Sequence, residues 1–464
     1  MHLNGLSCYY LGEIKRMSLK VIASGAFNLL IRRCTGPFLY RRQWLKKTQW
    51  LPKDELADIQ LALLKKIVLH AERYVPYYQK IMKEKGFTSA DIRSLEDIQL
   101  FPVLTKKDII EAGDDLVSRS YPRKTLRLAY TGGTTGTPVK IYRSPFSIGT
   151  EHAFVRRQWD WAGIKLSDRA AFLTGRVIVP PDQTEGDLWA YDPFMKELIL
   201  STYHLTGSQA LNYIKAMKSY KIKALVGYPS AVSFLARVCI DSGLKLNLKA
   251  VLTSSETLTD SMRSAITEAF SCPVFDYFGS AERVSYIFTC EKGNYHVQSE
   301  YGITEFIPDG DSGTCKVVST GFWNKAMPFI RYDMGDTVVA SSEQCSCLRA
   351  FPVIKKIAGR QADVIKTPSG REFGAAILTH LLYGTDHILE SQIVQDRLDH
   401  LFIDYVPGER FSTQDLKAFE GLIRHHLPTE LTVEFRAVNS ISRTSSGKIK
   451  PVVSKIPGNP SGSI

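Results

Sequence analysis

Residues 130–140 read Y-T-G-G-T-T-G-T-P-V-K, from Tyr130 to Lys140. Glycines let backbone amides approach an anion closely, and threonine hydroxyls add hydrogen-bond donors. The composition therefore indicates a phosphate-binding loop, although a Gly/Thr cluster taken alone is more often a surface turn. The Walker spacing G-x-x-x-x-G-K-[ST] is absent, which excludes that class of nucleotide site. The segments 126–129 and 139–142 on either side are predicted to form the two strands of a hairpin.

The segments after this loop alternate between strand and helix patterns. A helix is predicted over residues 146–162, followed by strands and helices at 170–173, 210–220, 224–226, 231–242 and 250–253. Such alternation predicts a parallel sheet with crossover helices. Ligands of these sheets gather beyond the carboxyl ends of the strands. Ser254, Ser255 and Glu256 follow the last of these strands, and a polar turn that caps the next helix is the alternative reading of them.

The length and charge of the chain limit its class. A chain of 464 residues is too long for one hydrophobic core, so two or three domains are expected. Of the net charge of +12, the first fifty residues contribute nine Lys or Arg and one Glu. The basic surplus therefore belongs to a leader over residues 1–50, with Met17 as an alternative start, and we expect no nucleic-acid partner.

The leader is not predicted to cross a membrane. Its apolar part, residues 18–30, is shorter than the roughly 20 residues that span a bilayer, and it lacks a small-residue cleavage site. Peripheral membrane association through an amphipathic helix and a solvated or packed helix remain as alternatives. The scattered cysteines are typical of a reducing cytoplasm, so we predict a cytoplasmic protein, with the inner face of the membrane as the alternative.

Further motifs follow in order along the chain. V-F-D-Y-F-G-S-A-E-R (274–283) places Glu282 just after a glycine, where a carboxylate suits Mg²⁺. P-F-I-R-Y-D-M-G-D (328–336) and I-A-G-R-Q-A-D (357–363) contain Asp336 and Arg360, and one carboxylate can accept hydrogen bonds from two hydroxyls. I-S-R-T-S-S-G-K-I-K (441–450) is a Ser/Gly loop that can deliver a lysine charge to a phosphorus centre.

Taken together, these motifs resemble the adenylate-forming (AMP-binding) ligase superfamily. H-A-E-R-Y-V-P-Y-Y (70–78) and F-P-V-L-T-K-K (101–107) resemble the phenylacetate-CoA ligases and the related capsular polysaccharide biosynthesis (CapK) proteins. The resemblance covers residues 56–455. It implies a large α/β domain (51–359), a small α+β C-terminal lid (360–455) and a tail (456–464). It also implies activation of a carboxylic acid by ATP with Mg²⁺, then transfer to coenzyme A, with a carrier-protein thiol or an amine as alternative acceptors.

The resemblance assigns roles to individual residues. It implies that Lys448, with Lys450 as the alternative, and Glu282 are catalytic, and that Glu282 also binds magnesium. The residues implied to bind the nucleotide are Thr131, Gly132, Gly133, Thr134, Thr135, Gly136, Ser255, Glu256, Phe278, Gly279, Asp336 and Arg360.

Three positions depart from the family pattern. Phe278 stands where tyrosine is usual, Ala281 where a hydroxyl residue is usual, and Ala362 at the hinge position that is usually Asp or Lys. The first two changes affect the segment expected beside the α-phosphate. They therefore support a second hypothesis, in which the chain binds nucleotide as a scaffold of polysaccharide assembly without turnover.

Four residues predict a metal site. Cys290 and His296 stand at C-x₅-H, and Cys345 and Cys347 at C-x-C, which supplies ligands that Zn²⁺ prefers. Buried, unpaired cysteines with a core histidine are the alternative. The resemblance favours zinc, because some phenylacetate-CoA-ligase-like proteins carry such residues at matching positions. A closed site with four protein ligands is structural.

Overall fold

The computed structural model describes most of the chain, in two compact units. The described residues are 21, 23–130, 139–180, 183, 185–310, 313–360, 364–370, 372–374, 382, 387–444 and 446–456. Unit 1 consists of Met1–Leu30, Ala162–Phe275 and Ala362–Ile464, and unit 2 of Ile31–Trp161 and Asp276–Gln361. The predicted phosphate loop, Thr131–Gly136, and Ala362 lie outside the described residues.

The helices of unit 2 include the one predicted over residues 146–162. They are α2 (Gly36–Thr48), α3 (Lys53–Tyr74), α4 (Pro76–Lys85), α5 (Lys106–Ala112) and α6 (Pro145–Trp161). Pro76 separates α3 from α4 because proline lacks the amide that would continue the helix. Thr105 and Asp108, whose spacing of three residues is typical of a capping box, form one at the start of α5.

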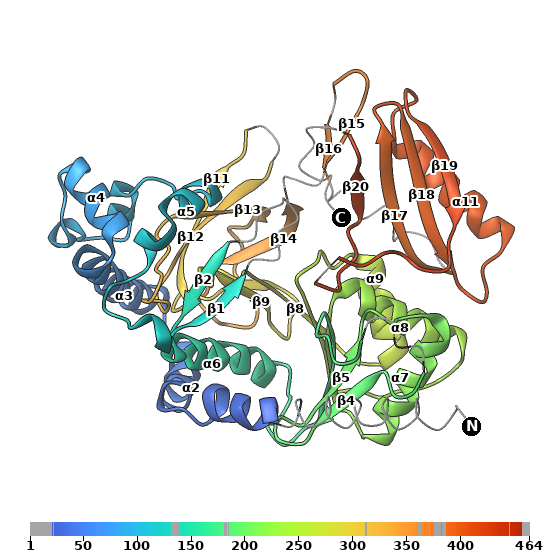
Figure 1. Ribbon diagram of the computed structural model, residues 1–464, viewed down its shortest axis with the longest axis horizontal. Helices are drawn as coiled ribbons and strands as arrows, with labels where there is room; N and C mark the ends of the chain where they lie inside the picture. The colour runs from blue at the N-terminus through green and yellow to red at the C-terminus, as the bar shows by residue number, and fades with distance from the viewer. Residues whose placement is uncertain are drawn as a thin grey trace, which may run out of the picture. The chain divides into compact units, whose positions relative to one another are not determined.

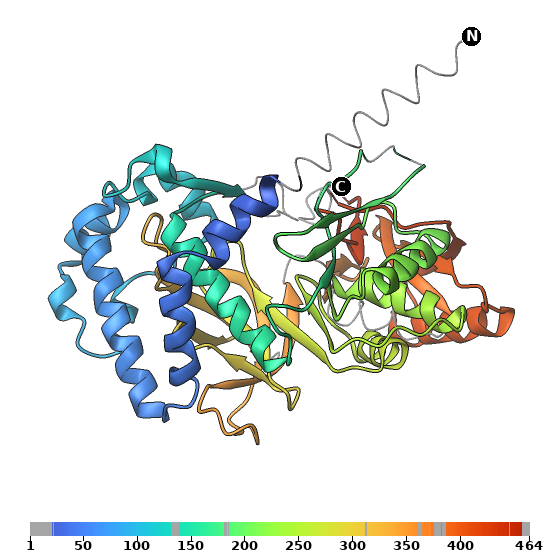
Figure 2. The ribbon, with the colours of Figure 1, turned by 90° about the horizontal axis from the view of Figure 1, so that it is seen from below.

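Helix α2 lies within residues that the sequence assigns to the basic leader. Its Phe38 and Leu45 side chains are buried in the core of unit 2, at 3% and 1% exposure. Figure 2 shows α2 running beside α6. No helix in the described part of the chain combines the length and the apolar character that crossing a bilayer requires.

The strands of unit 2 pair antiparallel. The predicted hairpin is confirmed, because β1 (Arg127–Tyr130) pairs with β2 (Lys140–Arg143). The larger sheet was not predicted; it runs in the order β11 (Gly302–Pro308), β12 (Cys315–Gly321), β13 (Tyr332–Ala340), β14 (Val353–Arg360), β10 (Tyr295–Val297), β9 (Tyr286–Thr289) and β8 (Val274–Gly279). Each described pair in this run is antiparallel.

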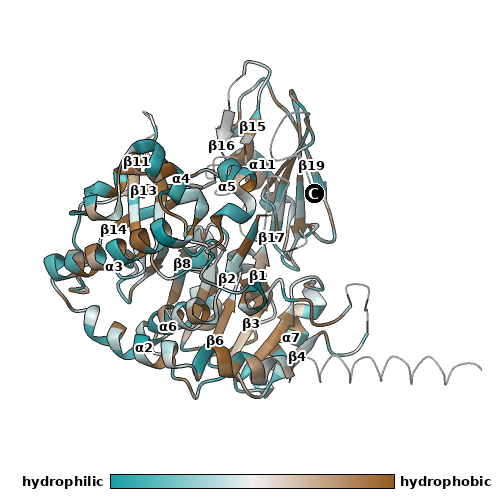
Figure 3. Ribbon diagram, turned by 60° about the vertical axis from the view of Figure 1, so that its left-hand side comes forward, coloured by the Kyte–Doolittle hydropathy of each residue, from teal (hydrophilic) through white to brown (hydrophobic). Residues whose placement is uncertain are grey.

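The sheet of unit 1 has the predicted parallel strands. Its order is β7 (Ala250–Ser254), β6 (Ala224–Gly227), β3 (Ala170–Thr174), β5 (Glu197–Ser201) and β4 (Trp189–Asp192), with helices α7 (Gly207–Ser219), α8 (Pro229–Asp241) and α9 (Asp260–Phe270). The pairs β3–β6, β6–β7 and β3–β5 are parallel, and β4 is an antiparallel edge strand. Brown, the hydrophobic colour, marks β3 in Figure 3, as expected for a strand covered on both faces.

The C-terminal part of unit 1 is a small α+β region. Its sheet has the order β19 (Thr432–Ala437), β18 (His400–Pro407), β17 (Ile388–Arg397) and β20 (Val452–Ser454), beside the hairpin of β15 (Val364–Lys366) and β16 (Glu372–Gly374). Helix α11 (Thr413–His426) packs on this sheet through the buried Phe419 and Ile423 (Figure 1). A larger α/β part with a small C-terminal α+β part confirms the predicted fold class.

Candidate functional site

Lys448 lies at the end of a tight turn, called here the lysine hairpin (residues 443–449). The Thr444 amide donates to the Lys448 carbonyl at 2.9 Å, and the Gly447 amide donates to the Thr444 carbonyl at 2.8 Å. Gly447 has a φ of +74°, a backbone conformation that glycine adopts without strain. Arg443 and Ile449 form an antiparallel bridge at the base of the turn.

The lysine hairpin contacts the carboxyl ends of three parallel strands of unit 1. Gly175, Tyr228 and Ser255 are the residues that follow β3, β6 and β7. The Tyr228 hydroxyl donates to the Ser446 carbonyl at 3.0 Å and accepts from the Gly175 amide at 3.2 Å. Lys448 Nζ donates to the Ser255 carbonyl at 3.3 Å and lies 5.4 Å from the centre of the Tyr228 ring. The lysine charge is thus held at the strand ends where sheet ligands gather.

Two glycines permit this close approach. A Cβ atom on Gly175 would lie 1.8 Å from the Ser446 carbonyl oxygen, and a Cβ atom on Gly447 would lie 2.5 Å from Thr202 Oγ1. Real Cβ atoms essentially never come within 3.0 Å of a neighbouring heavy atom, and the one on Gly447 would also lie 2.7 Å from the backbone Cα of Gly175. Neither position therefore accepts a larger residue while the hairpin stays in place.

Buried carboxylates lie near the lysine hairpin. Glu256 Oε2 accepts from the Ser230 amide at 3.0 Å, in the first turn of α8. Burial raises the pKa of Glu256, while the Ser230 hydrogen bonds and the charges of Lys448 and Arg443 lower it. The Arg443 guanidinium donates to the buried Glu390 carboxylate. Burial raises the pKa of Glu390 to about 7, against the opposing effect of Arg443.

These contacts change the interpretation of residues 254–256, at the end of β7 and directly after it. Glu256 caps the N-terminus of α8, the helix that precedes β7, whereas the alternative reading placed such a cap on the helix that follows. Ser255 is exposed, has a φ of +71° and contributes its carbonyl oxygen to the lysine contact.

Glu282 and the segment around it belong to unit 2. Phe278 is buried, and it and Gly279 are the last residues of β8. The Glu282 side chain is buried, and its Oε1 accepts a hydrogen bond from the Tyr332 hydroxyl at 3.1 Å. This contact fixes one carboxylate oxygen. A fixed, buried carboxylate is chemically suited to an oxygen-loving cation such as Mg²⁺.

The structure brings Asp336 and Arg360 together. Asp336 lies in β13 directly after Gly335, whose φ is +69°, and it is the register partner of Arg360 in β14. The Asp336 side chain is 9% exposed. The two residues are 24 positions apart in the sequence, and the antiparallel ladder makes them neighbours.

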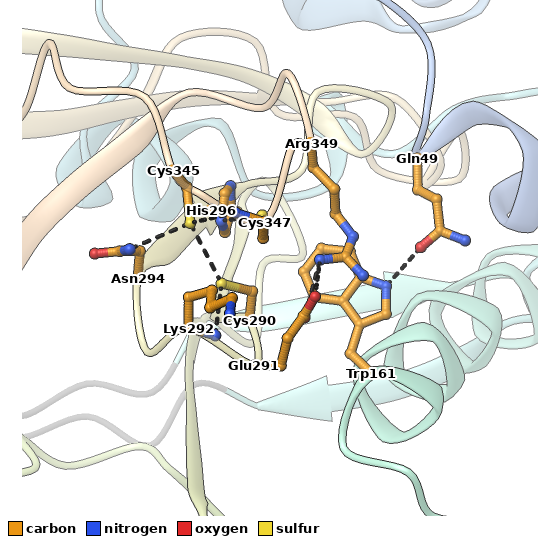
Figure 4. A network of polar contacts seen from close by, with 10 residues as sticks. All are labelled: Gln49, Trp161, Cys290, Glu291, Lys292, Asn294, His296, Cys345, Cys347 and Arg349. Carbon is orange, nitrogen blue, oxygen red and sulfur yellow. Dashed lines mark hydrogen bonds and ion pairs between the residues drawn. The ribbon is translucent and has the colours of Figure 1, made fainter.

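Cys290, His296, Cys345 and Cys347 form a cluster in unit 2, called here the Cys/His cluster (Figure 4). Their ligand atoms all lie within 4.8 Å of one another, and all four side chains are buried. The Cys290 and Cys345 sulfurs are 3.6 Å apart, and Cys347 Sγ is 3.3 Å from His296 Nε2. A tetrahedral zinc ion with Zn–S bonds of about 2.3 Å separates two sulfurs by about 3.8 Å. The ligand set and its spacing therefore fit Zn²⁺.

The surroundings of the cluster favour metal binding. Burial and the nearby Arg349 charge lower the pKa of His296 to about 4, so its imidazole is neutral at pH 7, the form that binds metals. The Asn294 amide donates to Cys345 Sγ at 3.2 Å, and the Lys292 amide donates to Cys290 Sγ at 3.3 Å. Such donors stabilise the negative charge of thiolate ligands.

Several contacts around the lysine hairpin were not predicted. Gly175, Glu390 and Arg443 were not considered as site residues in the sequence analysis. Arg443 lies inside the 441–450 motif, and a charged residue at the start of that turn was the one sequence feature that could have indicated its role. Its partner Glu390 is 53 positions away and gives no local signal.

Comparisons with known proteins agree with this architecture. Residues 365–455 match the family model of the CapK C-terminal domain. The chain is 24% identical over 408 residues to protein CapK of Staphylococcus aureus, covering 87% of this chain and 90% of that protein. It is 25% identical over 333 residues to the phenylacetate-coenzyme A ligase of Aromatoleum evansii, covering 68% and 72%.

A solved structure shows a similar fold. The crystal structure of 2-hydroxyisobutyryl-CoA ligase, in the postadenylation state in complex with R3-HIB-AMP, aligns with a TM-score of 0.68. The alignment covers 88% of this chain and 91% of that one, at 20% sequence identity. At this identity the likeness concerns the fold.

Proposed function

Because the chain belongs to the adenylate-forming (AMP-binding) ligase superfamily, in its phenylacetate-CoA ligase-like and CapK family, we propose that it activates a carboxylic acid with ATP. A carboxylate oxygen attacks the α-phosphorus, the bond from that phosphorus to the oxygen bridging it to the β-phosphorus breaks, and pyrophosphate leaves. A thiol, most simply that of coenzyme A, then attacks the acyl carbon of the adenylate. The thioester forms, and AMP leaves with the electron pair of the broken C–O bond.

The position of Lys448 is the main observation in support of this proposal. Its ammonium group is held at the carboxyl ends of the parallel strands by the contact with Ser255 and by the Tyr228–Ser446 hydrogen bond. A fixed positive charge there stabilises the negative charge that develops on the phosphoryl oxygens and the departing pyrophosphate.

Residues of unit 2 receive the remaining roles in the proposal. Glu282 would hold Mg²⁺, which neutralises charge on the triphosphate, and the Tyr332 hydrogen bond orients its carboxylate. Asp336 would accept hydrogen bonds from the ribose hydroxyls, and Arg360 would contact the ribose or a phosphate, as their ladder pairing supports. The loop Thr131–Gly136 is proposed to bind the β- and γ-phosphates on the sequence pattern alone. We assign the acyl product to polysaccharide biosynthesis, as the sequence resemblance implies.

Acid-dependent ATP–pyrophosphate exchange tests the proposal. A panel of aryl, fatty, hydroxy and amino acids would be screened with the wild-type protein, the Lys448→Ala variant and the Lys455→Ala variant as the matched control. Lys455 is an exposed lysine seven residues further along. We expect exchange with one class of acid, a loss of about 10²- to 10³-fold in Lys448→Ala and no loss in the control. Equal exchange in the two variants would remove Lys448 from the mechanism.

A nucleotide-binding scaffold without turnover is the second candidate. Phe278 and Ala281 replace the residues usual in the segment beside the α-phosphate, and this departure is the observation in its favour. Calorimetric ATP binding together with no exchange for any acid in the panel would select this candidate over the ligase.

We also propose that the Cys/His cluster holds one structural Zn²⁺. All four ligands come from the protein, so no coordination position is left for water or substrate. Metal analysis of the purified protein tests this, with close to one equivalent of zinc expected per chain. Less than about half an equivalent would contradict the assignment.

A further inference from the structure

A cavity of about 520 Å³ lies in unit 2 beside the Cys/His cluster. It is called here the arginine cavity, and α2 and α6 form most of its wall. Its lining residues are Arg42, Leu45, Lys46, Gln49, Trp50, Ala153, Arg157, Asp160, Trp161, Glu291 and Arg349. A volume of this size accommodates a small organic ligand. None of the residues assigned to the adenylation reaction lines it.

Positive charge exceeds negative charge around this cavity. Arg157 is paired with the buried Glu300 at 2.8 and 3.0 Å, and Arg349 is paired with Glu291 at 2.9 Å. Asp160 is shared between two arginines, Arg156 at 2.6 Å and Arg42 at 3.5 Å. Three acidic groups therefore face four arginines.

Lys46 adds a further positive charge on the same wall. No ion pair of Lys46 occurs among the described residues, and its side chain is exposed. The surplus at the arginine cavity is therefore two positive charges. A ligand that carries up to two negative charges would balance it.

Three of the arginines at the cavity keep an Nε donor that is closed off from solvent. The Nε atoms of Arg42, Arg157 and Arg349 are buried and have no hydrogen-bond partner within the described part of the chain. The side chains of Arg157 and Arg349 are only 3% and 6% exposed. Donors closed off in this way are out of reach of a ligand in the cavity, so the attraction for an oxyanion comes from the charge of the guanidinium groups, whose geometry carboxylate and phosphate oxygens match best.

Trp50 gives the cavity a flat apolar surface, whereas the Trp161 ring is packed against Arg349, Phe288 and Phe351. The Arg349 guanidinium lies 3.9 Å from the Trp161 ring and 4.7 Å from the Trp50 ring. Trp161 is fixed by a hydrogen bond from its Nε1 to Gln49 Oε1 at 2.7 Å, as Figure 4 shows. Trp50 is 56% exposed, so its ring has a face open to a ligand. Aromatic rings stack on such surfaces.

From these features we infer that the arginine cavity is a second binding site, separate from the adenylation site, for a small aromatic oxyanion. Carboxylates and phosphate esters share the required chemistry. Because the surplus charge is two, an aryl phosphate, which is close to a dianion above pH 7, should bind more tightly than an aryl carboxylate. A neutral aromatic amide of the same shape should bind most weakly.

The loops of the Cys/His cluster position part of this cavity. Glu291 directly follows Cys290, and Arg349 is two residues after Cys347. The ion pair between Glu291 and Arg349 therefore connects the two loops at the cavity wall (Figure 4). The ligand site and the cluster are thus neighbours in the same pair of loops.

Titration of the full-length protein with phenyl phosphate, benzoate and benzamide tests the inference. Tryptophan fluorescence and calorimetry would both be recorded, with AMP present at saturation. We expect the dissociation constants to rise in that order, with phenyl phosphate on the order of 1 mM or below. Lys46→Gln should weaken phenyl phosphate about five-fold, whereas Lys47→Gln, a change at the neighbouring exposed lysine that does not line the cavity, should leave it within about two-fold.

Further readouts separate the two parts of the inference. Trp50→Ala should weaken all three aromatic probes, because it removes the stacking surface. Equal binding of benzamide and phenyl phosphate, or equal effects of Lys46→Gln and Lys47→Gln, would overturn the oxyanion site. Displacement of phenyl phosphate by AMP, or by the acid that supports pyrophosphate exchange, would overturn its separation from the adenylation site. The binding readouts do not require the protein to be an active ligase.

Discussion

Replacement of Gly175 with alanine should move the lysine hairpin away from the strand ends. The added Cβ atom would lie 1.8 Å from the Ser446 carbonyl oxygen, a backbone atom that cannot rotate away. A carbon–oxygen contact needs about 3.3 Å, so the hairpin must retreat by about 1.5 Å. Gly175 does not have a positive φ, so alanine is compatible with the backbone at that position itself.

The size of the effect follows from this displacement. A misplacement of about 1 Å in a catalytic group can lower the rate about 10²-fold. The hydrogen bond from Tyr228 to Ser446, worth about 1 kcal/mol, would also be strained or lost. We therefore expect pyrophosphate exchange to fall at least about 10²-fold, equivalent to about 2.7 kcal/mol of transition-state stabilisation.

Two measurements check this prediction. Exchange would be measured for Gly175→Ala and for Gly207→Ala, where an added Cβ atom has nothing within 4 Å. Hydrogen exchange of residues 443–449 provides a second readout that does not depend on catalysis, and it should accelerate only in Gly175→Ala. If Gly175→Ala is folded, exchanges pyrophosphate at the wild-type rate and keeps its hairpin protected, then the close contact with Ser446 has no functional role.

The remaining predictions concern the metal, the pH dependence and the core. The Cys290→Ser variant should lose zinc, and its thermal unfolding midpoint should fall by about 5 °C or more. The Cys315→Ser variant, changed outside the cluster, should keep its zinc. Unchanged zinc content in Cys290→Ser would contradict the prediction. The folded state raises the pKa of Glu390 from 4.5 to about 7, so it holds the proton more tightly than the unfolded state, and stability should decline as pH rises through this range. The decline is on the order of 3 kcal/mol, and urea unfolding at several pH values should show it reduced in Glu390→Gln. Leu45→Ala should lower the free energy of unfolding by about 2–5 kcal/mol in the same assay. Leu39→Ala, at an exposed position of α2, should lower it by less than about 0.5 kcal/mol, and equal losses would mean that α2 is not part of the core.

Local patterns predicted local structure well. Thr105 and Asp108 are three residues apart, so the capping box was visible in the sequence and is present in the structure. The parallel strands β3, β6 and β7 were predicted for a similar reason, because each is a short apolar run followed by a helical pattern. The four residues of the Cys/His cluster were identified by chemistry, since few other roles gather cysteine and histidine at such spacings.

Pairings between distant segments were not predictable from periodicity. The antiparallel sheet of unit 2 contains strands with no helices between them, so alternation gave no information about their order. The ion pair between Arg443 and Glu390 depends on two chain segments meeting, and neither residue is unusual by itself. In α2, arginines and lysines outnumber the buried Phe38 and Leu45, so the charged residues hid a helix that forms part of the core.

The attachment of the lysine hairpin at both ends determines how fast Lys448 can move. The hairpin lies between β19 and β20 in the sequence, and Arg443 at its base is paired with Glu390 in β17. Because its base is joined to the C-terminal sheet, the turn cannot swing as an independent loop. Departure of the lysine from Ser255 must then carry that sheet with it, a collective motion on the microsecond-to-millisecond timescale, whereas a free side chain reorients in picoseconds to nanoseconds. The rate at which the lysine charge is delivered or withdrawn would therefore be set by the sheet's motion, and solvent viscosity should affect turnover more than the nature of the acid does.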